Sequence, residues 1–147
     1  MKILLGEDYA AASERAAEVI RDVVKAKPDA VLGLATGSSP VGMYKALVEM
    51  NRRGEISFAK CKSVNLDEYV GLAPEHDRSY AYFMAKNFFD HIDIDKKNTN
   101  LPSGLAPDLA AECLRYDGVI ASMGGIDIQV LGIGNNGHIG FNEPSES

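Results

Sequence analysis

The stretch Ala30-Val31-Leu32-Gly33-Leu34-Ala35-Thr36-Gly37-Ser38-Ser39-Pro40 determines which fold this chain can adopt. Its first six residues form a continuous apolar run, which is typical of a strand buried on both faces of a parallel sheet. A glycine turn rich in hydroxyl groups follows, and Ser39 with Pro40 suits the cap and first turn of a helix. The stretch therefore predicts a strand that passes directly into a helix, which is the repeating unit of α/β proteins.

The segments on both sides continue this alternation. We predict strands at residues 2–5, 30–35, 61–66, 98–101 and 126–131, and helices from Asp8 to the Lys27-Pro28-Asp29 stop, from Pro40 to Gly54, and over 79–90 and 107–123. In the first helix the apolar face consists of Ala12, Ala16, Ile20, Val23 and Val24. Right-handed crossovers between such strands predict a three-layer, Rossmann-like α/β sandwich with a mostly parallel sheet.

The composition excludes several classes of protein. With 46% hydrophobic residues, a net charge of -6 and no Lys/Arg cluster, the chain lacks the concentrated positive face that nucleic-acid binding needs. No apolar run approaches the roughly 20 residues of a membrane helix, and the N-terminal run is too short for a signal peptide. We therefore expect a cytoplasmic protein without a membrane partner. Cys61 and Cys113 have no Cys or His nearby, so we expect two buried thiols, with neither a zinc site nor a disulfide.

Ligands of parallel sheets bind at the carboxyl ends of the strands, which directs attention to residues 36–40, 67–77 and 132–143. In the first of these loops, Gly37 permits close backbone approach. The hydroxyls of Thr36, Ser38 and Ser39, together with free amides at a helix start, can hold a phosphate or a carboxylate. The loop lacks the Gly-Lys-Ser/Thr ending that a nucleoside triphosphate requires. A capped turn without a ligand is the alternative interpretation.

Two acidic residues, Asp67 and Glu68, begin the second loop where a buried strand emerges. Their mutual repulsion and partial burial raise a carboxyl pKa toward the range useful for a general base. Successive side chains of a strand face opposite ways, so only one of the two can point into a given pocket. The alternative is a pair of solvated loop residues.

The third loop contains Gly132-Ile133-Gly134-Asn135-Asn136-Gly137, which matches the dinucleotide pattern G-x-G-x-x-G. We consider the match misleading, because the residues after it do not favour a helix and no acidic residue follows about 20 positions later. The loop also presents Asn136, His138 and Glu143, and a neighbouring acid can orient an imidazole and stabilise its charged form. This set suits proton transfer, and a structural histidine is the alternative.

Two long motifs, residues 66–72 (Leu-Asp-Glu-Tyr-Val-Gly-Leu) and 134–144 (Gly-Asn-Asn-Gly-His-Ile-Gly-Phe-Asn-Glu-Pro), resemble glucosamine-6-phosphate deaminases of the glucosamine/galactosamine-6-phosphate isomerase family. Residues 34–40, 44–48 and 87–91 also resemble segments of that family, in the same order. The resemblance implies conversion of an amino-sugar phosphate, glucosamine 6-phosphate, and water to fructose 6-phosphate and ammonia. It implies no metal and no organic cofactor.

The family pattern also implies roles for individual residues. His138 opens the pyranose ring with help from Asn136 and Glu143, and Asp67 takes the proton from carbon 2. The residues that bind the substrate are Thr36, Gly37, Ser38, Ser39 and Glu68.

The chain departs from the family pattern in two respects. Many members carry aspartate at the position of Asn136, and an amide can orient His138 but cannot stabilise an imidazolium by charge. Members also continue past the position of Ser147 with further strands, a lid and basic phosphate ligands. We therefore expect residues 1–147 to form a single α/β domain that is incomplete at the C-terminus. The sequence leaves open whether the chain forms a homo-oligomer. Two alternatives are a non-catalytic sugar-phosphate-binding fragment and a hydrolase resembling phosphogluconolactonases.

Overall fold

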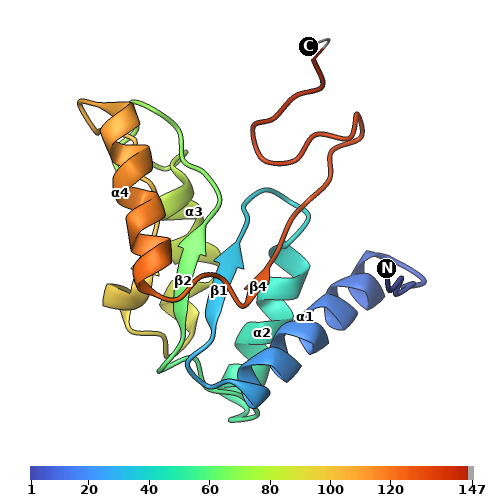
Figure 1. Cartoon of the computed structure of the whole chain (residues 1–147). Helices are drawn as coiled ribbons and strands as arrows, with labels where there is room; N and C mark the ends of the chain where they lie inside the picture. The colour runs from blue at the N-terminus through green and yellow to red at the C-terminus, as the bar shows by residue number, and fades with distance from the viewer. Residues whose placement is uncertain (146–147) are drawn as a thin grey trace.

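A parallel sheet forms the centre of the protein in a computed structural model that describes residues 1–145 (Figure 1). Its four strands lie in the order β3 (Thr99–Asn100), β2 (Lys62–Asn65), β1 (Val31–Leu34) and β4 (Ile128–Gln129). β1 pairs with β2 over four residues, whereas β3 and β4 each pair over two. Because every pair is parallel, the loops that follow β1, β2 and β4 leave the sheet at the same edge. The predicted α/β class with a mostly parallel sheet is confirmed.

Helices cover both faces of this sheet. They are α1 (Tyr9–Ala26), α2 (Val41–Arg52), α3 (Tyr80–Asn87) and α4 (Leu109–Ser122), with short 3₁₀ turns at Phe89–His91 and Lys96–Asn98. Leu32 and Leu34 of β1 belong to one hydrophobic cluster with α1, α2 and α3, whereas Val31 belongs to a second cluster with α4. This division follows from the alternation of side chains along a strand and produces three layers.

The larger cluster is built around aromatic rings. Tyr44 of α2 and Phe88 are fully buried and stack with their ring centroids 4.8 Å apart, and Phe58 meets Phe88 edge-on at 5.5 Å. The Tyr44 hydroxyl donates a 2.6 Å hydrogen bond to the carbonyl of Ala35, directly before the glycine turn. On the other face the Tyr116 hydroxyl of α4 lies 2.8 Å from the carbonyl of Asn65, where β2 ends. Buried tyrosines thus fix the ends of both central strands.

Several predictions about the elements were wrong in detail. Residues 2–5 form no strand, because no described strand pairs with them, and Leu5 is exposed. Ser39 does not cap α2, which starts at an N-cap Pro40 without a side-chain bond. Cys61 is buried as predicted, but Cys113 is exposed. The buried face of α1 is formed by Ser13, Ala17, Ile20 and Val24 rather than by Ala12 and Ala16.

Within the part of the chain that the structure describes, no helix combines the length and the apolar character needed to cross a membrane.

Candidate active site

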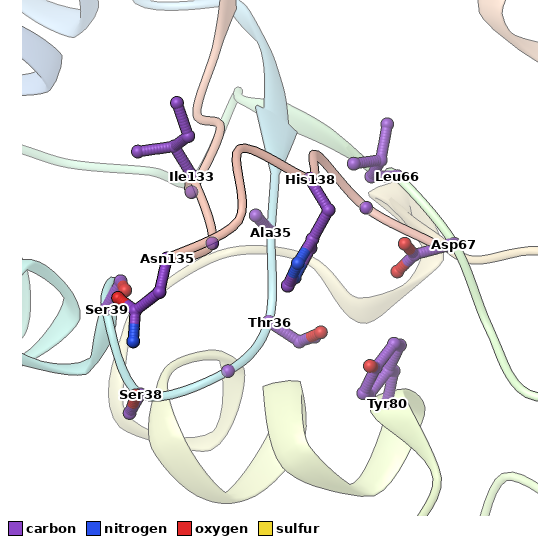
Figure 2. A pocket seen from close by; sticks show the side chains of 14 residues that line it. Ala35, Thr36, Ser38, Ser39, Leu66, Asp67, Tyr80, Ile133, Asn135 and His138 are labelled. Atoms are coloured by element: carbon purple, nitrogen blue, oxygen red, sulfur yellow. The ribbon is translucent and has the colours of Figure 1, made fainter. Parts of the chain in front are cut away.

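The three loops singled out by the sequence meet around a cavity of about 420 Å³ at the carboxyl edge of the sheet (Figure 2). Its wall includes residues 36–39 after β1, Leu66 and Asp67 after β2, and residues 132–135 with His138 and Gly140 after β4. Figure 2 shows the side chains of Thr36, Asp67 and His138 directed toward a common space. Residues far apart in the sequence therefore line one small polar site.

The loop of residues 36–39 offers hydrogen-bond donors to this cavity. Gly37 has a φ of 92°, a conformation that glycine adopts without strain. Among residues 1–145, no acceptor partners the backbone N–H groups of Gly37, Ser38 and Ser39. The loop also leads into the N-terminus of α2, where the helix dipole favours negative charge. We call residues 36–39 the anion loop, since free donors at a helix start suit an anionic group.

The two acidic residues after β2 have separate environments. Asp67 lines the cavity, and burial, reinforced by the charge of Glu68, raises the pKa of its carboxyl. The Glu68 carboxylate instead accepts hydrogen bonds of 2.8 and 2.9 Å from the backbone N–H groups of Tyr69 and Tyr80, and it does not line the cavity. It also accepts from Ala81 at 2.9 Å, so Glu68 caps the start of α3. Only one carboxylate of the pair reaches the cavity.

The third loop brings Asn136, His138 and Glu143 together. The Asn136 Nδ2 donates to Glu143 Oε2 at 2.7 Å, and the Asn136 Oδ1 lies 2.6 Å from His138 Nδ1. Glu143 Oε1 lies 3.6 Å from the same ring nitrogen. Because a carboxylate only accepts, it orients the amide so that Oδ1 faces the imidazole, and an amide oxygen also only accepts. His138 Nδ1 therefore carries the proton in the neutral ring, and Nε2 keeps its lone pair.

The glycines of this loop have steric roles. A Cβ added to Gly134 would lie 2.2 Å from His138 Nδ1, so the imidazole rests against the glycine backbone. A Cβ at Gly140 would lie 3.1 Å from Asp67 Oδ2, which places the loop beside the acidic residue. No helix begins at Gly137, whose φ of 86° turns the chain. The glycine pattern thus serves close packing around an imidazole, and no dinucleotide fingerprint is formed.

Tyr80 of α3 also lines the cavity, and the sequence analysis did not identify it. Its ring stacks with Phe141 at a centroid distance of 5.7 Å, and Tyr69 contacts both rings. Burial, helped by the neighbouring Tyr69 hydroxyl, raises the pKa of Tyr80 to about 12, so it remains a neutral hydroxyl. The only sequence signal for Tyr80 is the number of aromatic residues in its helix, which equally fits ordinary core packing.

No group of three or more His, Cys, Asp or Glu side chains among residues 1–145 could hold a metal ion.

Fold and cavity together define a class, namely three-layer α/β proteins in which a carboxylate and an imidazole lie beside a loop of free backbone donors at the carboxyl edge of the sheet. A family model described as glucosamine-6-phosphate isomerases/6-phosphogluconolactonase matches residues 7–140. The chain belongs to this family.

Curated relatives and solved structures agree with this assignment. The chain is 56% identical to the glucosamine-6-phosphate deaminase of Thermoanaerobacter sp. (strain X514) and 54% identical to that of Lachnoclostridium phytofermentans, over its whole length. It spans 58% and 62% of the length of these two relatives. The structure of a monomeric glucosamine-6-phosphate deaminase matches with a TM-score of 0.95 at 48% identity, over 100% of this chain and 61% of that one.

A 6-phosphogluconolactonase from Thermotoga maritima shares the fold, with a TM-score of 0.77 at 20% identity over 95% of this chain and 62% of that one.

Proposed function

We propose that this chain carries the proton-transfer part of a glucosamine-6-phosphate deaminase site. The observation that supports it best is that His138 and Asp67 line the same cavity as the anion loop, with Asn136 and Glu143 outside the cavity wall but bound to each other and to the His138 ring. An aldose-to-ketose conversion with loss of an amino group needs two separate proton-handling groups, because ring opening and carbon deprotonation occur at different atoms. The cavity offers both groups, and the similarity to named deaminases supports the same substrate.

In the proposed ring opening, His138 Nε2 accepts the proton of the hydroxyl on carbon 1. The bond between carbon 1 and the ring oxygen breaks as the carbonyl forms, and the ring oxygen then takes the proton from His138. Glu143, 3.6 Å from Nδ1, stabilises the transient imidazolium by charge. Asn136 holds the ring in the tautomer that leaves Nε2 basic.

In the proposed second step, Asp67 removes the proton from carbon 2 of the open chain. The electron pair of that bond forms a double bond between carbons 1 and 2, and the carbon 1 oxygen is protonated to give an enolamine. Protonation at carbon 1 then leaves an imine at carbon 2, and water replaces its nitrogen to give fructose 6-phosphate and ammonia. A raised pKa makes Asp67 a stronger base than an ordinary aspartate.

The substrate phosphate is assigned to the anion loop, through the amides and hydroxyls of Thr36, Gly37, Ser38 and Ser39. A direct substrate contact by Glu68 would require its carboxylate to leave the start of α3. We therefore assign Glu68 an indirect role, in which it fixes Tyr80 at the cavity wall.

The proposal extends to domain, location and assembly. Residues 1–147 are taken as part of one α/β domain. The location is taken as cytoplasmic, since a charged sugar phosphate does not cross a bilayer unaided and meets the protein in the compartment that holds it. All the assigned groups come from one chain, and the solved relative is described as monomeric, so a homo-oligomer is not required.

The deciding experiment measures ammonia released from glucosamine 6-phosphate by the purified protein, by Asp67→Asn and by a matched control. Asp117→Asn provides that control, because Asp117 is an exposed residue of α4. We expect Asp67→Asn to reduce ammonia release at least a hundredfold and Asp117→Asn to leave it unchanged. A protein that binds the sugar phosphate without releasing ammonia would be the non-catalytic fragment, and hydrolysis of a phosphogluconolactone without ammonia release would indicate the lactonase.

A further inference from the structure

Tyr9, the first residue of α1, reaches across to the anion loop and to the start of α2. Its hydroxyl lies 2.8 Å from the carbonyl oxygen of Ser38 and 3.1 Å from that of Ser39. The same hydroxyl accepts the backbone N–H of Gly42 at 2.9 Å. With one hydrogen and two lone pairs, a hydroxyl shared between two carbonyls can accept this third bond as well. Tyr9 thus joins three backbone groups about thirty residues away in the sequence.

These bonds determine which way the peptide groups of the anion loop face. In a trans peptide the carbonyl and the N–H point in opposite directions. Because the Ser38 carbonyl faces Tyr9, the N–H of Ser39 points away from Tyr9, and Ser39 belongs to the cavity wall. Carbonyl oxygens repel an anion, so holding two of them on the Tyr9 side leaves donors for the ligand.

Tyr9 also takes the place of the missing cap of α2. The N-cap residue of α2, Pro40, has no side chain that could bond to the first turn. The Tyr9 hydroxyl accepts the N–H of Gly42 instead, in the role expected of Ser39. Ser39 therefore stays in the cavity wall instead of folding back on its own helix.

Gly42 gives independent evidence that Tyr9 lies close to the start of α2. A Cβ added to Gly42 would lie 3.0 Å from Cε1 of Tyr9 and 2.3 Å from Oγ of Ser13. Both contacts belong to α1, so glycine at this position lets the start of α1 approach the start of α2.

We propose that Tyr9 is a positioning residue for the anionic group of the substrate, acting through the backbone of Ser38 and Ser39. It does not touch the ligand, since it lies outside the cavity wall. The identity of the anion as a sugar phosphate rests on the proposed function, whereas the positioning of the loop does not.

The test compares Tyr9→Phe, which removes one oxygen atom, with the matched variant Tyr82→Phe. Tyr82 lies on α3, outside the cavity wall, and its hydroxyl makes no hydrogen bond within residues 1–145. Inorganic phosphate is titrated into each protein while the amide resonances of Gly37 and Ser39 are followed by NMR. Loss of one hydrogen-bonding group should raise the phosphate dissociation constant about three- to tenfold in Tyr9→Phe and leave it unchanged in Tyr82→Phe.

Kinetics with glucosamine 6-phosphate provide a readout that a purely structural role would not move. Tyr9→Phe should raise KM by a similar factor and change kcat less than twofold, because no proton-transfer group is touched. Gly42→Ala keeps every hydroxyl, but its Cβ would lie 2.3 Å from Ser13 Oγ and 3.0 Å from Tyr9 Cε1. It therefore pushes the start of α1, including Tyr9, away from α2 and should weaken phosphate binding in the same direction.

The possible failures are distinguishable. Phosphate shifts in the wild type with unchanged affinity in both Tyr9→Phe and Gly42→Ala would overturn the role of Tyr9 and leave the proposed function standing. A fall in kcat together with a lower melting temperature, with KM unchanged, would also overturn it, because Tyr9 would then be only structural. A wild-type protein whose amides do not respond to phosphate would refute the anion loop, and the role of Tyr9 with it.

Discussion

The side chain of Asn136 shows how a single amide sets the chemistry of a neighbouring ring. Its nitrogen donates to Glu143 and its oxygen lies against His138 Nδ1, so the negative charge of the group resides on Glu143 instead of at position 136. An aspartate at position 136 would bring a second negative charge next to Glu143. Asparagine therefore preserves the orientation of the ring, and in the proposed ring opening the charge that stabilises the imidazolium is that of Glu143, 3.6 Å away.

At the same scale, Gly134→Ala tests whether the ring position matters. The added Cβ would overlap Cε1 and Nδ1 of His138, both 2.2 Å away, so the imidazole must leave its bond to Asn136. We expect kcat for glucosamine 6-phosphate to fall at least tenfold, since proton transfer needs hydrogen-bond geometry. Gly118→Ala, where an added Cβ meets no atom within 4 Å, is the control and should keep wild-type kcat. Wild-type activity in Gly134→Ala would contradict the ring-opening role of His138.

Among the elements, β4 is attached to β1 by a side chain as well as by backbone hydrogen bonds. It pairs with β1 at only two positions, but Asp127, directly before it, accepts hydrogen bonds from Lys27 Nζ and from the backbone N–H of Val31 at 2.8 Å each. These bonds hold the start of β4 against the end of α1 and the start of β1. Since β4 leads into the loop of His138, Asp127 also fixes where that loop leaves the sheet.

Replacing Asp127 by Asn should therefore lower stability in a pH-dependent way. The hydrogen bond from Lys27, followed by that from Val31, lowers the pKa of Asp127 in the folded protein. The unfolded state then binds the proton first as pH falls, so this stabilisation is present above the ordinary carboxyl pKa and disappears below the lowered one. We expect the melting temperature of Asp127→Asn to be a few degrees below wild type at pH 7, with the gap closing in strong acid. Asp22→Asn, which removes an exposed carboxylate beside Arg21, is the control. A difference in melting temperature between Asp127→Asn and wild type that persists in acid would contradict the charged contact.

Local patterns predicted the elements and the loops that form the cavity, but not contacts between distant residues. Residues 31–34 are recognisable because both faces of the strand are buried, and the carboxyl-edge rule then selects the three loops. The stretch of residues 2–5, with its apolar run Ile3-Leu4-Leu5, resembles a strand, but strand formation depends on a partner that no local pattern reveals. The contacts of Tyr9 could not be predicted for the same reason, since its hydrogen-bond partners lie near position 40. The tautomer of His138 follows only from the hydrogen bonds that Asn136 makes in the structure.

At the scale of the whole molecule, the two faces of the sheet are unequally packed. The cluster beneath α1, α2 and α3 contains most of the buried apolar residues, whereas Val31, Val64 and Tyr116 are the buried residues on the α4 side. Because Tyr44 belongs to the larger cluster and also holds the carbonyl before the anion loop, the core directly supports the site.

Phe88→Ala tests this dependence. Phe88 is fully buried and contacts three aromatic rings, so its truncation leaves a cavity and should lower the free energy of unfolding by about 3 to 5 kcal/mol. Urea denaturation checks this value. Leu114→Ala, at a side chain that is 75% exposed, should change the free energy of unfolding by less than about 0.5 kcal/mol. If Phe88→Ala lowered the free energy of unfolding as little as Leu114→Ala does, the core would tolerate the cavity.

The central place of β1 in the sheet has a consequence for how the protein is made. Leu32 pairs with Ser63 on one side and with Ile128 on the other, so one neighbour follows closely in the chain and the other arrives much later. At a synthesis rate of roughly 5–20 residues per second, several seconds separate the emergence of β2 from that of β4. During that interval the growing chain already holds the anion loop and Asp67, but not the histidine. The ribosome thus synthesises the anion loop and Asp67 several seconds before His138, the residue to which we assign ring opening.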